Sequence, residues 1–325
     1  MTASRNPGGK VQRVRAGAQA EGQRLDNFLL RELAGVPRSR VYRLLRRGEV
    51  RVNGKRKQPD YRLSASDEVR LPPVRERPEP PPGSRRVPDA LLATIQQAIV
   101  HEDARLLVLD KPAGLAVHGG SGLAFGAIEA LRALRPDEPL ELAHRLDRDT
   151  SGCLLVARTR SALRALHAML RQGTVEKHYA TLVAGRWHLG RKTIDAPVLT
   201  HARQGGERVV RVHRAGKIAL SVFAPLEHFK DVATRMDVAI QTGRTHQIRV
   251  HAAFAGHPVA GDEKYGDRDF NARLRDQGLR RMFLHAASIA FVWPEGGDAF
   301  RIEAPLPADL ASLLERLRES PRAQG

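Results

Sequence analysis

The sequence predicts an α+β protein of two domains, a small basic module over residues 11–73 and a larger domain over residues 90–320. A length of 325 residues fits about two domains. Apolar residues make up 42% of the chain and charged residues 28%, as in ordinary globular proteins. The larger region alternates apolar, strand-like runs with helical patterns.

Two segments fall outside the predicted domains. Residues 1–10 are small, polar and rich in glycine, so we expect a disordered tail. Residues 74–89 belong to the stretch PPVRERPEPPPGSRRVPD, which contains too much proline for a helix or a central strand. This segment is expected to be an extended linker between the domains.

The charge of the chain predicts a polyanionic partner. Lysine and arginine number 54 against 36 acidic residues, a formal net charge of +18. Such a field attracts polyanions, and nucleic acid is the leading class. An arginine-rich genome, or a need for solubility alone, would give the same composition without such a partner.

The location is predicted from features that the sequence lacks. The single cysteine, Cys153, excludes a disulfide framework and a cysteine-based zinc cluster. The first residues have no hydrophobic core of a secretory signal, and no apolar run reaches the roughly 20 residues that span a bilayer. We therefore expect a cytoplasmic protein that does not enter a membrane.

The small module is predicted to bind a phosphate backbone. In SRVYRLLRRGEV, the positions of Val41, Leu44 and Leu45 predict a buried helix face, and Gly48 predicts the helix end. Asn53-Gly54 favours a tight hairpin turn. The preceding helix, RLDNFLLREL, would bury four residues: Leu25, Phe28, Leu29 and Leu33. A second face and the hairpin carry the candidate RNA-binding residues, which are Arg40, Arg43, Arg47, Lys55 and Arg56. A merely solvated charged face is the alternative.

The segment HRLDRDTSG, residues 144–152, carries the main catalytic candidate. It precedes the buried strand CLLVARTR, and its Asp-Thr-Ser-Gly end predicts a turn, so Asp147 should lie on a loop. Arg145 and Arg148 are expected to lower the pKa of Asp147, which suits a nucleophile or a general base. Asp149 competes as a turn-forming carboxylate, and spacing alone does not choose between the two. His144 is expected to hold the loop by a hydrogen bond.

A second segment, TGRTHQIRVHAAFAGHPVAGD, predicts a short helix. Thr245 is the predicted N-cap, and Gly256 followed by Pro258 ends the helix. Arg249 would then lie in the first turns, where it could hold an ionised Asp147. An ordinary structural ion pair is the alternative.

Two further features were weighed as site candidates. His246 and His251 are five residues apart, which on a helix separates their side chains by roughly 140°, and no metal motif supports them, so no metal site is expected. Tyr179 lies in the predicted strand EKHYATLV, where it could stack on an extruded base. A core tyrosine is the alternative.

Four segments in order resemble the pseudouridine synthases that modify bacterial ribosomal RNA. They are LDKPAGLAVH, HRLDRDTSG, KHYATLV and TGRTHQIRVH, and the small module resembles an S4 RNA-binding domain through EGQRLDNFLL, SRVYRLLRRGEVRVNG and DEVRLPP. The resemblance covers residues 11 to about 318. It implies a catalytic domain with a mixed, mostly antiparallel sheet flanked by helices. It also implies the isomerisation of uridine without a cofactor.

The resemblance assigns roles residue by residue. Asp147 would be the catalytic aspartate and Arg249 its basic partner. Tyr179 would stack on the target uracil and assist a late proton transfer. Arg145 would evict the base and fill the gap, Ile248 would line the uracil pocket, and His144 would lie beside them in the substrate-binding segment.

The implied partner is 23S rRNA or a large-subunit assembly intermediate, bound by a monomer. Within the family, the run AHRLDRDTSGCLLVARTRSALRALHAMLRQG resembles the members that modify several separate uridines of 23S rRNA. Ala143 stands where family members usually have a branched apolar residue, and Cys153 stands where they usually have an aliphatic residue. Neither position carries chemistry. Other rRNA or tRNA uridines are an alternative substrate. A non-catalytic assembly factor, a glycosidase and a nuclease are the alternative functions.

Overall fold

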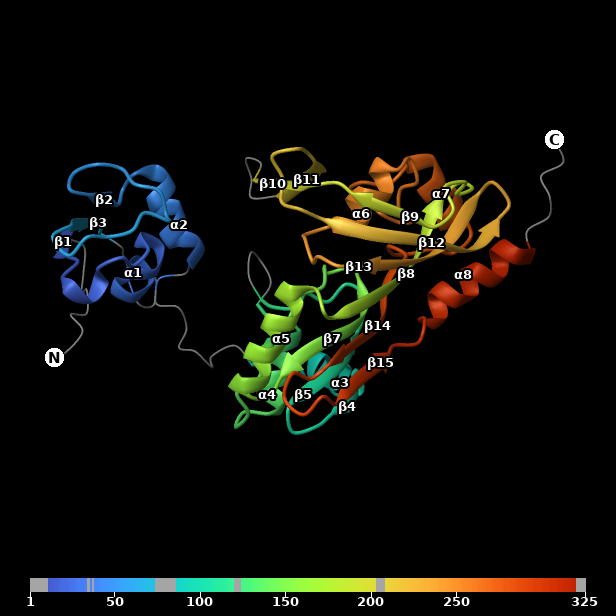
Figure 1. The fold of residues 1–325 in the computed structure, drawn as a ribbon, viewed down its shortest axis with the longest axis horizontal. Coiled ribbons are helices and arrows are strands. Elements are labelled where there is room, and N and C mark those ends of the chain that lie inside the picture. The colour runs from blue at the N-terminus through green and yellow to red at the C-terminus, as the bar shows by residue number, and fades with distance from the viewer. Residues whose placement is uncertain are drawn as a thin grey trace. The chain divides into compact units, whose positions relative to one another are not determined.

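The computed structural model describes residues 11–33, 36, 38–73, 86–119, 124–202 and 208–319. The chain divides into two compact units, Met1–Arg86 and Val87–Gly325 (Figure 1). The tail expected at residues 1–10 and most of the expected linker lie outside the described residues. The linker prediction was wrong at its last residue, because Asp89 begins a helix, where an acidic side chain favours the first turn.

The first unit is a three-stranded antiparallel sheet packed against two helices. Its strands are β1 (Gln12–Arg15), β2 (Arg51–Val52) and β3 (Glu68–Leu71), in the order β1-β3-β2, and its helices are α1 (Leu25–Glu32) and α2 (Arg38–Arg47). The predicted apolar faces of both helices are confirmed. The buried residues of this core include Leu25, Phe28, Leu29, Leu33, Val41, Leu44 and Leu45.

Two predicted backbone reversals in this unit are confirmed. Gly48 has φ 70° and its N–H bonds the carbonyl of Leu45, which ends α2. Asn53 and Gly54 have φ 49° and 74°, and the N–H of Lys55 closes the turn on the carbonyl of Val52 at 2.9 Å. The main partner of β2 is nevertheless β3, so this turn is not the centre of a long hairpin.

The second unit is built on a ten-stranded sheet. Its helices are α3 (Asp89–Gln97), α4 (Ala127–Leu134), α5 (Arg160–Gln172), α6 (Gln247–Phe254), α7 (Arg268–Asp276) and α8 (Ala308–Glu319). The sheet strands are β4 (Ile99–Glu102), β5 (Leu106–Lys111), β6 (Glu141–Leu142), β7 (Ser151–Ala157), β8 (Glu176–Ala184), β9 (Lys192–Asp195), β12 (Leu220–Phe229), β13 (Ala233–Ile240), β14 (Leu284–Val292) and β15 (Ala299–Glu303). β10 (Val198–Ala202) and β11 (Arg208–Val212) form a separate hairpin.

The order of the strands confirms the predicted mixed, mostly antiparallel sheet. The main path runs β4-β5-β7-β14-β8-β13-β12-β9, with β15 beside β14 and β6 beside β7. Only β7 and β14 pair in parallel among the described strands. Side chains alternate across this sheet, because successive strand residues face opposite sides.

Helices cover both faces of the sheet (Figure 1). In β5, Leu107 and Leu109 join the core that includes residues of α3, α4 and α6. Leu106 and Val108 of the same strand join the core that includes α5. A further cluster packs α7 and α8 on the other half of the sheet. The face with α6 is the one that carries the site described next.

Candidate active site

The loop before β7 holds Asp147 and is fixed from several sides. The backbone N–H of Leu155 donates to Nε2 of His144 at 3.0 Å, and the N–H of Ala143 donates to the carbonyl of Leu155 at 3.0 Å. The buried Lys111 Nζ donates to the carbonyl of Arg148 at 3.0 Å. A short loop tied to two strands presents its side chains with little freedom.

Two pKa shifts accompany these anchors. Burial lowers the pKa of His144 to about 4, so its ring is neutral near pH 7 and Nε2 can accept a hydrogen bond. The loop-holding role expected for His144 is thereby confirmed. Burial likewise lowers the pKa of Lys111 to about 8, although its Nζ is bound by three carbonyl oxygens, those of Pro112, Leu115 and Arg148.

The predicted turn at Asp-Thr-Ser-Gly is shifted. The turn spans Asp147–Thr150, where the N–H of Thr150 bonds the carbonyl of Asp147 at 3.2 Å. Ser151 and Gly152 already belong to β7, because both pair with β14 and Gly152 also pairs with β5. Long-range strand pairing therefore overrides the local turn preference of these residues.

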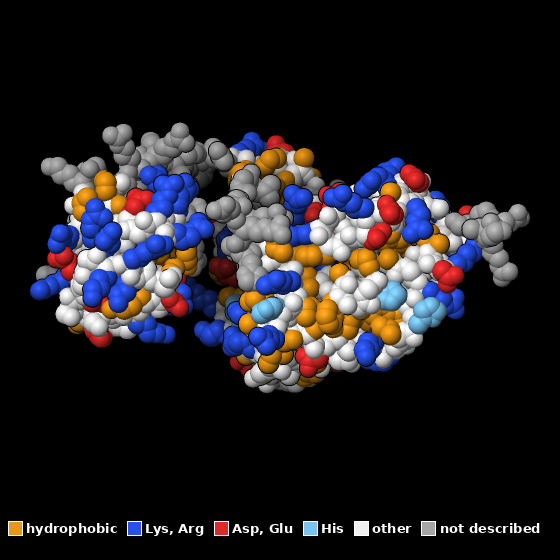
Figure 2. Space-filling model, turned by 90° about the horizontal axis from the view of Figure 1, so that it is seen from above, with side chains coloured by type: hydrophobic (Ala, Val, Ile, Leu, Met, Phe, Trp, Pro, Cys, Tyr) orange, Lys and Arg blue, Asp and Glu red, His pale blue; other side chains and the backbone are white. Residues whose placement is uncertain are grey.

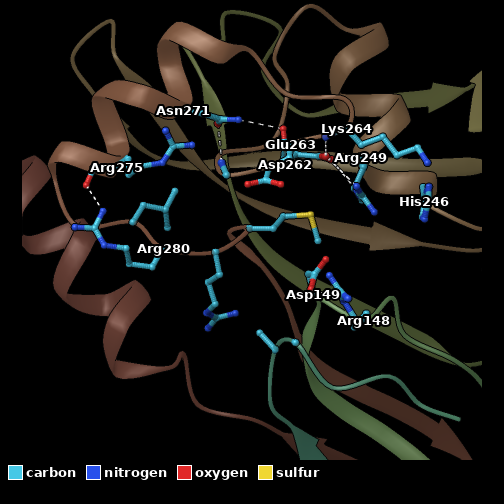
Figure 3. A pocket seen from close by; sticks show the side chains of 16 residues that line it. Arg148, Asp149, His246, Arg249, Asp262, Glu263, Lys264, Asn271, Arg275 and Arg280 are labelled. Atoms are coloured by element: carbon cyan, nitrogen blue, oxygen red, sulfur yellow. Dashed lines mark hydrogen bonds and ion pairs between the residues drawn. The ribbon is translucent and has the colours of Figure 1, made fainter. Parts of the chain in front are cut away.

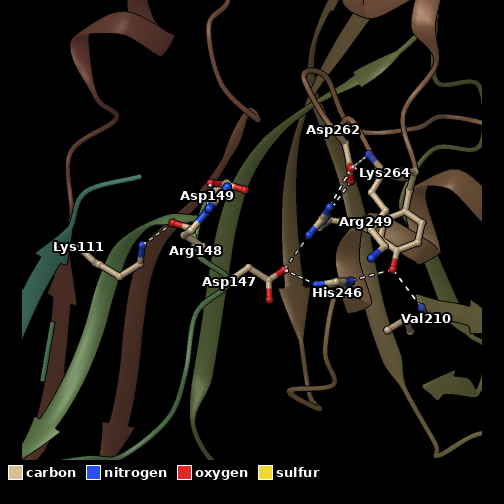
Figure 4. Close-up of polar contacts among 10 residues, drawn as sticks. Lys111, Asp147, Arg148, Asp149, Val210, His246, Arg249, Asp262 and Lys264 are labelled. Carbon is tan, nitrogen blue, oxygen red and sulfur yellow. Dashed lines mark hydrogen bonds and ion pairs between the residues drawn. The ribbon is translucent and has the colours of Figure 1, made fainter. Parts of the chain in front are cut away.

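Arg249 connects Asp147 to a second, buried carboxylate (Figure 4). Its Nη1 donates to Oδ2 of Asp147 at 3.2 Å, while Nε and Nη2 donate to Asp262 at 2.7 and 2.8 Å. The side chain of Asp262 is 0% exposed and that of Asp147 is 18% exposed. Asp262 thus takes the Nε and Nη2 side of the guanidinium, and Nη1 donates to Asp147.

The charges of this group are mutually stabilised. Burial lowers the pKa of Arg249, but hydrogen bonds and charge from Asp262 and Asp147 raise it above its ordinary value overall. Burial raises the pKa of Asp262, but the hydrogen bond and charge of Arg249, together with backbone hydrogen bonds from Tyr265 and Lys264, lower it below its ordinary value. Both partners therefore stay ionised near neutral pH, as the pairing of buried charges requires.

The prediction that Arg145 and Arg148 supply the cations beside Asp147 was wrong. Arg148 Nε contacts Asp149 Oδ1 at 3.2 Å instead. The side chain of Arg145 is exposed and has no hydrogen bond within the described ranges. Neighbours in sequence point in different directions on an irregular loop, so the cation comes from α6, 102 positions away.

The N-terminus of α6 also differs from the prediction. The helix begins at Gln247, and its cap residue is His246 in a left-handed conformation (φ 54°, ψ 22°), rather than Thr245. The Oε1 of Gln247 accepts hydrogen bonds from Thr242 Oγ1 at 2.7 Å and from the N–H of Arg244 at 3.1 Å. This side chain satisfies the entering backbone in place of a Thr245 cap. The predicted end at Gly256 is confirmed, with φ 82°.

A small cavity of about 60 Å³ lies directly beside Asp147. Five of the predicted site residues line it: Arg145, Asp147, Tyr179, Ile248 and Arg249. His144 is not among its lining residues. Tyr179 is 7% exposed, and burial together with the charge of Asp147 raises its pKa, so its hydroxyl stays protonated. The cavity thus offers apolar and aromatic walls with one carboxylate.

A larger cavity of about 980 Å³ adjoins the first through His246 and Arg249, which line both (Figure 3). Its cationic lining residues include Arg148, Lys264, Arg275, Arg280 and Arg281. Arg281 is tied to Asp309 at 2.7 Å and to Ser151 at 3.0 Å. The other lining residues include the buried Asp262, Asn271, Leu279 and Met282, and the cations around them suit a polyanionic ligand.

Three residues of the site escaped the sequence analysis: His246, Asp262 and Tyr265. His246 was weighed only as a metal ligand, but its Nδ1 lies 2.8 Å from the hydroxyl of Tyr265. His251 instead contacts Ser221 and Ala196. In the part of the chain that the structure describes, no group of three His, Cys, Asp or Glu residues could hold a metal. Asp262 closes the quoted motif, but no pattern in one sequence indicates that a charged residue is buried.

The first unit presents the predicted basic residues at its surface. Arg43, Arg47, Lys55 and Arg56 are exposed, and Arg40 is partly buried. Arg56 also donates to the carbonyl of Arg46. Lys and Arg side chains are spread over the visible face of this unit (Figure 2). No described helix is long and apolar enough to cross a membrane.

The fold and the site define a class of protein. The carboxylate of Asp147 is held by the buried guanidinium of Arg249 and lines a small cavity that also contains Tyr179. A larger cavity with several cations adjoins it, and the chain has a second, basic unit. This arrangement is that of an enzyme acting on a nucleic acid.

Comparisons with known proteins identify the family. Residues 105–254 match the RNA pseudouridylate synthase model and residues 23–69 match the S4 domain. The chain is 52% identical over 313 residues to ribosomal large subunit pseudouridine synthase C of Salmonella typhi, covering 95% of this chain and 97% of that one. The identity to the protein of the same name in Escherichia coli K12 is 52% over 308 residues, covering 93% and 95%.

Solved structures agree with this result. Human RNA pseudouridylate synthase domain containing 4 is 25% identical with a TM-score of 0.59, covering 71% of this chain and 96% of that one. Human RNA pseudouridylate synthase domain containing 1 is 27% identical with a TM-score of 0.54, covering 69% and 95%. The chain therefore belongs to the RNA pseudouridylate synthase family, with an S4 domain ahead of the catalytic domain.

Proposed function

We propose that this enzyme isomerises uridines of 23S rRNA to pseudouridine, with Asp147 as the catalytic aspartate. The observation that carries the proposal is the Asp147–Arg249 contact of 3.2 Å beside a cavity walled by Tyr179. The names of the relatives from Salmonella typhi and Escherichia coli support the large-subunit substrate.

The reaction needs a flipped nucleotide and one reactive carboxylate. The C1′–N1 bond of uridine breaks, the uracil turns, C5 bonds C1′, and the C5 hydrogen leaves as a proton while N1 gains a proton. This needs no redox change and no donor, so we propose that no cofactor takes part. Asp147 attacks C1′ or removes the C2′ proton, and both routes use its ionised form. Extruding the base costs a few kcal/mol. Tyr179 offsets this cost by stacking on the extruded uracil, and the exposed Arg145 fills the gap that the base leaves in the RNA.

The remaining roles follow from position. Ile248 lines the cavity that receives the uracil. His144 contributes to substrate binding by holding the loop that carries Asp147. In the S4 unit, Arg40, Arg43, Arg47, Lys55 and Arg56 bind phosphates. The cationic large cavity accepts the RNA around the target. We propose that the enzyme acts in the cytoplasm as a monomer, on 23S rRNA or a large-subunit assembly intermediate.

The test is tritium release from 23S rRNA transcribed with uridine labelled at C5. Asp147→Asn removes the charge but keeps the shape, and we expect the rate of release to fall about a thousand-fold or more. Binding of the same RNA, measured by filter retention, should stay within about three-fold, because phosphate contacts dominate affinity.

Asp149→Asn is the matched variant in the same loop. Its carboxylate contacts the exposed Arg148 and not Arg249, so a much smaller loss is expected. Full release by Asp147→Asn, together with loss by Asp149→Asn, would refute the assignment. Strand scission or free uracil in place of isomerised RNA would favour a nuclease or a glycosidase.

A further inference from the structure

A chain of polar contacts leads from the β10–β11 hairpin to Asp147. The backbone N–H of Val210 in β11 donates to the hydroxyl oxygen of Tyr265 at 3.1 Å. That hydroxyl lies 2.8 Å from Nδ1 of His246, and Nε2 of His246 lies 3.8 Å from Oδ2 of Asp147 (Figure 4).

These contacts favour one position for the proton on the ring of His246. A backbone N–H can only donate, so Tyr265 is an acceptor toward Val210. The hydroxyl proton of Tyr265 can then go to Nδ1 of His246, which lies 2.8 Å from the hydroxyl oxygen. A neutral imidazole that accepts at Nδ1 carries its hydrogen on Nε2. That N–H faces the carboxylate of Asp147.

Geometry around Asp147 distinguishes its two oxygens. Arg249 Nη1 and His246 Nε2 both approach Oδ2, at 3.2 and 3.8 Å. The second oxygen, Oδ1, has no hydrogen-bond donor within the described residues (Figure 4). Arg249 donates to this oxygen and His246 lies close to it, so the other oxygen remains for a reacting atom.

The backbone of His246 points to the same conclusion. This residue has φ 54° and ψ 22°, and it is one of three residues other than glycine with positive φ in the described chain. Such conformations persist where the surrounding structure enforces them, and they gather at active sites. Here the left-handed cap turns the side chain toward Asp147 as α6 begins.

The charged groups around the ring keep it neutral. Burial lowers the pKa of His246, the carboxylate of Asp147 acts against this, and Arg249 and Lys264 lower it further, while Asp262 acts to raise it. The pKa lies below the ordinary value, so the ring is uncharged at neutral pH. A neutral imidazole can donate to Asp147 without placing a second positive charge beside Arg249.

We propose that His246 is a positioning residue for Asp147. When RNA enters, its Nε2–H closes on Oδ2 and turns Oδ1 toward the ribose, and Tyr265 fixes the required tautomer. The present 3.8 Å separation exceeds a hydrogen bond, as is common for sites without substrate. The inference rests on the proposed function of Asp147, and it makes the β10–β11 hairpin part of the positioning apparatus through Val210.

The first experiment measures the tautomer without turnover. The full-length protein labelled with ¹⁵N-histidine is examined by NMR at pH 7.5, and the signals of His246 are assigned by their absence in His246→Asn. We expect Nδ1 to be unprotonated and Nε2 to be protonated in the wild type. In Tyr265→Phe the two forms should mix. A protonated Nδ1 in the wild type would overturn the proposal.

The second experiment measures single-turnover tritium release and KM. His246→Asn suits the left-handed backbone, which asparagine tolerates, but its side chain is too short to reach Oδ2. We expect the rate to fall about ten-fold with KM nearly unchanged, since a hydrogen bond to a charged group is lost. Tyr265→Phe keeps the aromatic ring over the Arg249 guanidinium, so we expect a smaller fall in the rate of tritium release than in His246→Asn.

Tyr61→Phe is the matched control. It removes a hydroxyl that contacts Asp67 in the first unit, and the rate should be unchanged. An unchanged rate in His246→Asn would refute the positioning role. The NMR result needs no active enzyme, so it separates a failure of this inference from a failure of the role given to Asp147.

Discussion

At the scale of single residues, the site depends on how two carboxylates share one guanidinium. Asp262 binds Arg249 through two hydrogen bonds and is fully buried, whereas Asp147 takes the third N–H and stays accessible. A free arginine would bind Asp147 with its whole fork. The buried carboxylate therefore keeps Asp147 available for chemistry.

Asp262→Asn tests this sharing through stability. The variant leaves a buried guanidinium without its main counter-charge, and we expect a loss of about 2–3 kcal/mol in urea denaturation of the full chain. Asp149→Asn breaks a pair whose side chains are 60% and 47% exposed, and should cost less than about 0.5 kcal/mol. Equal losses in the two variants would show that burial does not matter here.

At the scale of elements, β7 and β14 bring the catalytic loop to its place. They pair in parallel at Ser151 and Gly152, where β7 begins. Gly152 has φ 105°, and a Cβ at this position would overlap the carbonyl oxygen of Ala286 in β14. The close approach of the two strands thus requires glycine within five residues of Asp147.

Gly152→Ala is expected to destabilise the second unit by about 2 kcal/mol or more, because it adds a steric overlap to an unfavourable φ. The melting temperature measured by calorimetry should fall by about 5 °C or more. Gly190→Ala is the control, since Gly190 has φ 57° but open space around a Cβ. It should cost about 1 kcal/mol. A smaller loss at Gly152 than at Gly190 would contradict this account.

At the scale of the whole molecule, charge and division into two units serve one substrate. The net charge of +18 is distributed over both units, as exposed arginines of α2 and as cations of the large cavity. Each phosphate contact releases counterions, so the affinity for RNA should depend on salt.

RNA affinity is expected to fall steeply between about 50 and 200 mM salt. The double variant Arg43→Glu/Arg47→Glu should weaken binding of 23S rRNA and reduce the salt slope by about two. Arg301→Glu is the control, because this arginine of β15 already pairs with Glu303. Fluorescence anisotropy at a series of salt concentrations measures the affinity of each variant for RNA and the dependence of that affinity on salt. A flat affinity in the wild type would argue against phosphate contacts as the source of binding.

The sequence alone determined the local features and the family. The buried faces of α1 and α2, the turns at Gly48 and Asn53-Gly54, the strand after Asp147 and the short helix with Arg249 follow from periodicity and backbone preference, which act over a few residues. The motif around Asp147 also led to the family that the comparisons identify.

Only the tertiary structure decided which groups meet. The family resemblance paired Arg249 with Asp147, but only the fold shows that the two side chains meet, across 102 positions of sequence, and that Asp262, His246 and Tyr265 join them. Ser151 and Gly152 became strand instead of turn for the same reason. Pairing between distant strands and the burial of charge depend on the whole fold, and a local pattern of residues does not encode them.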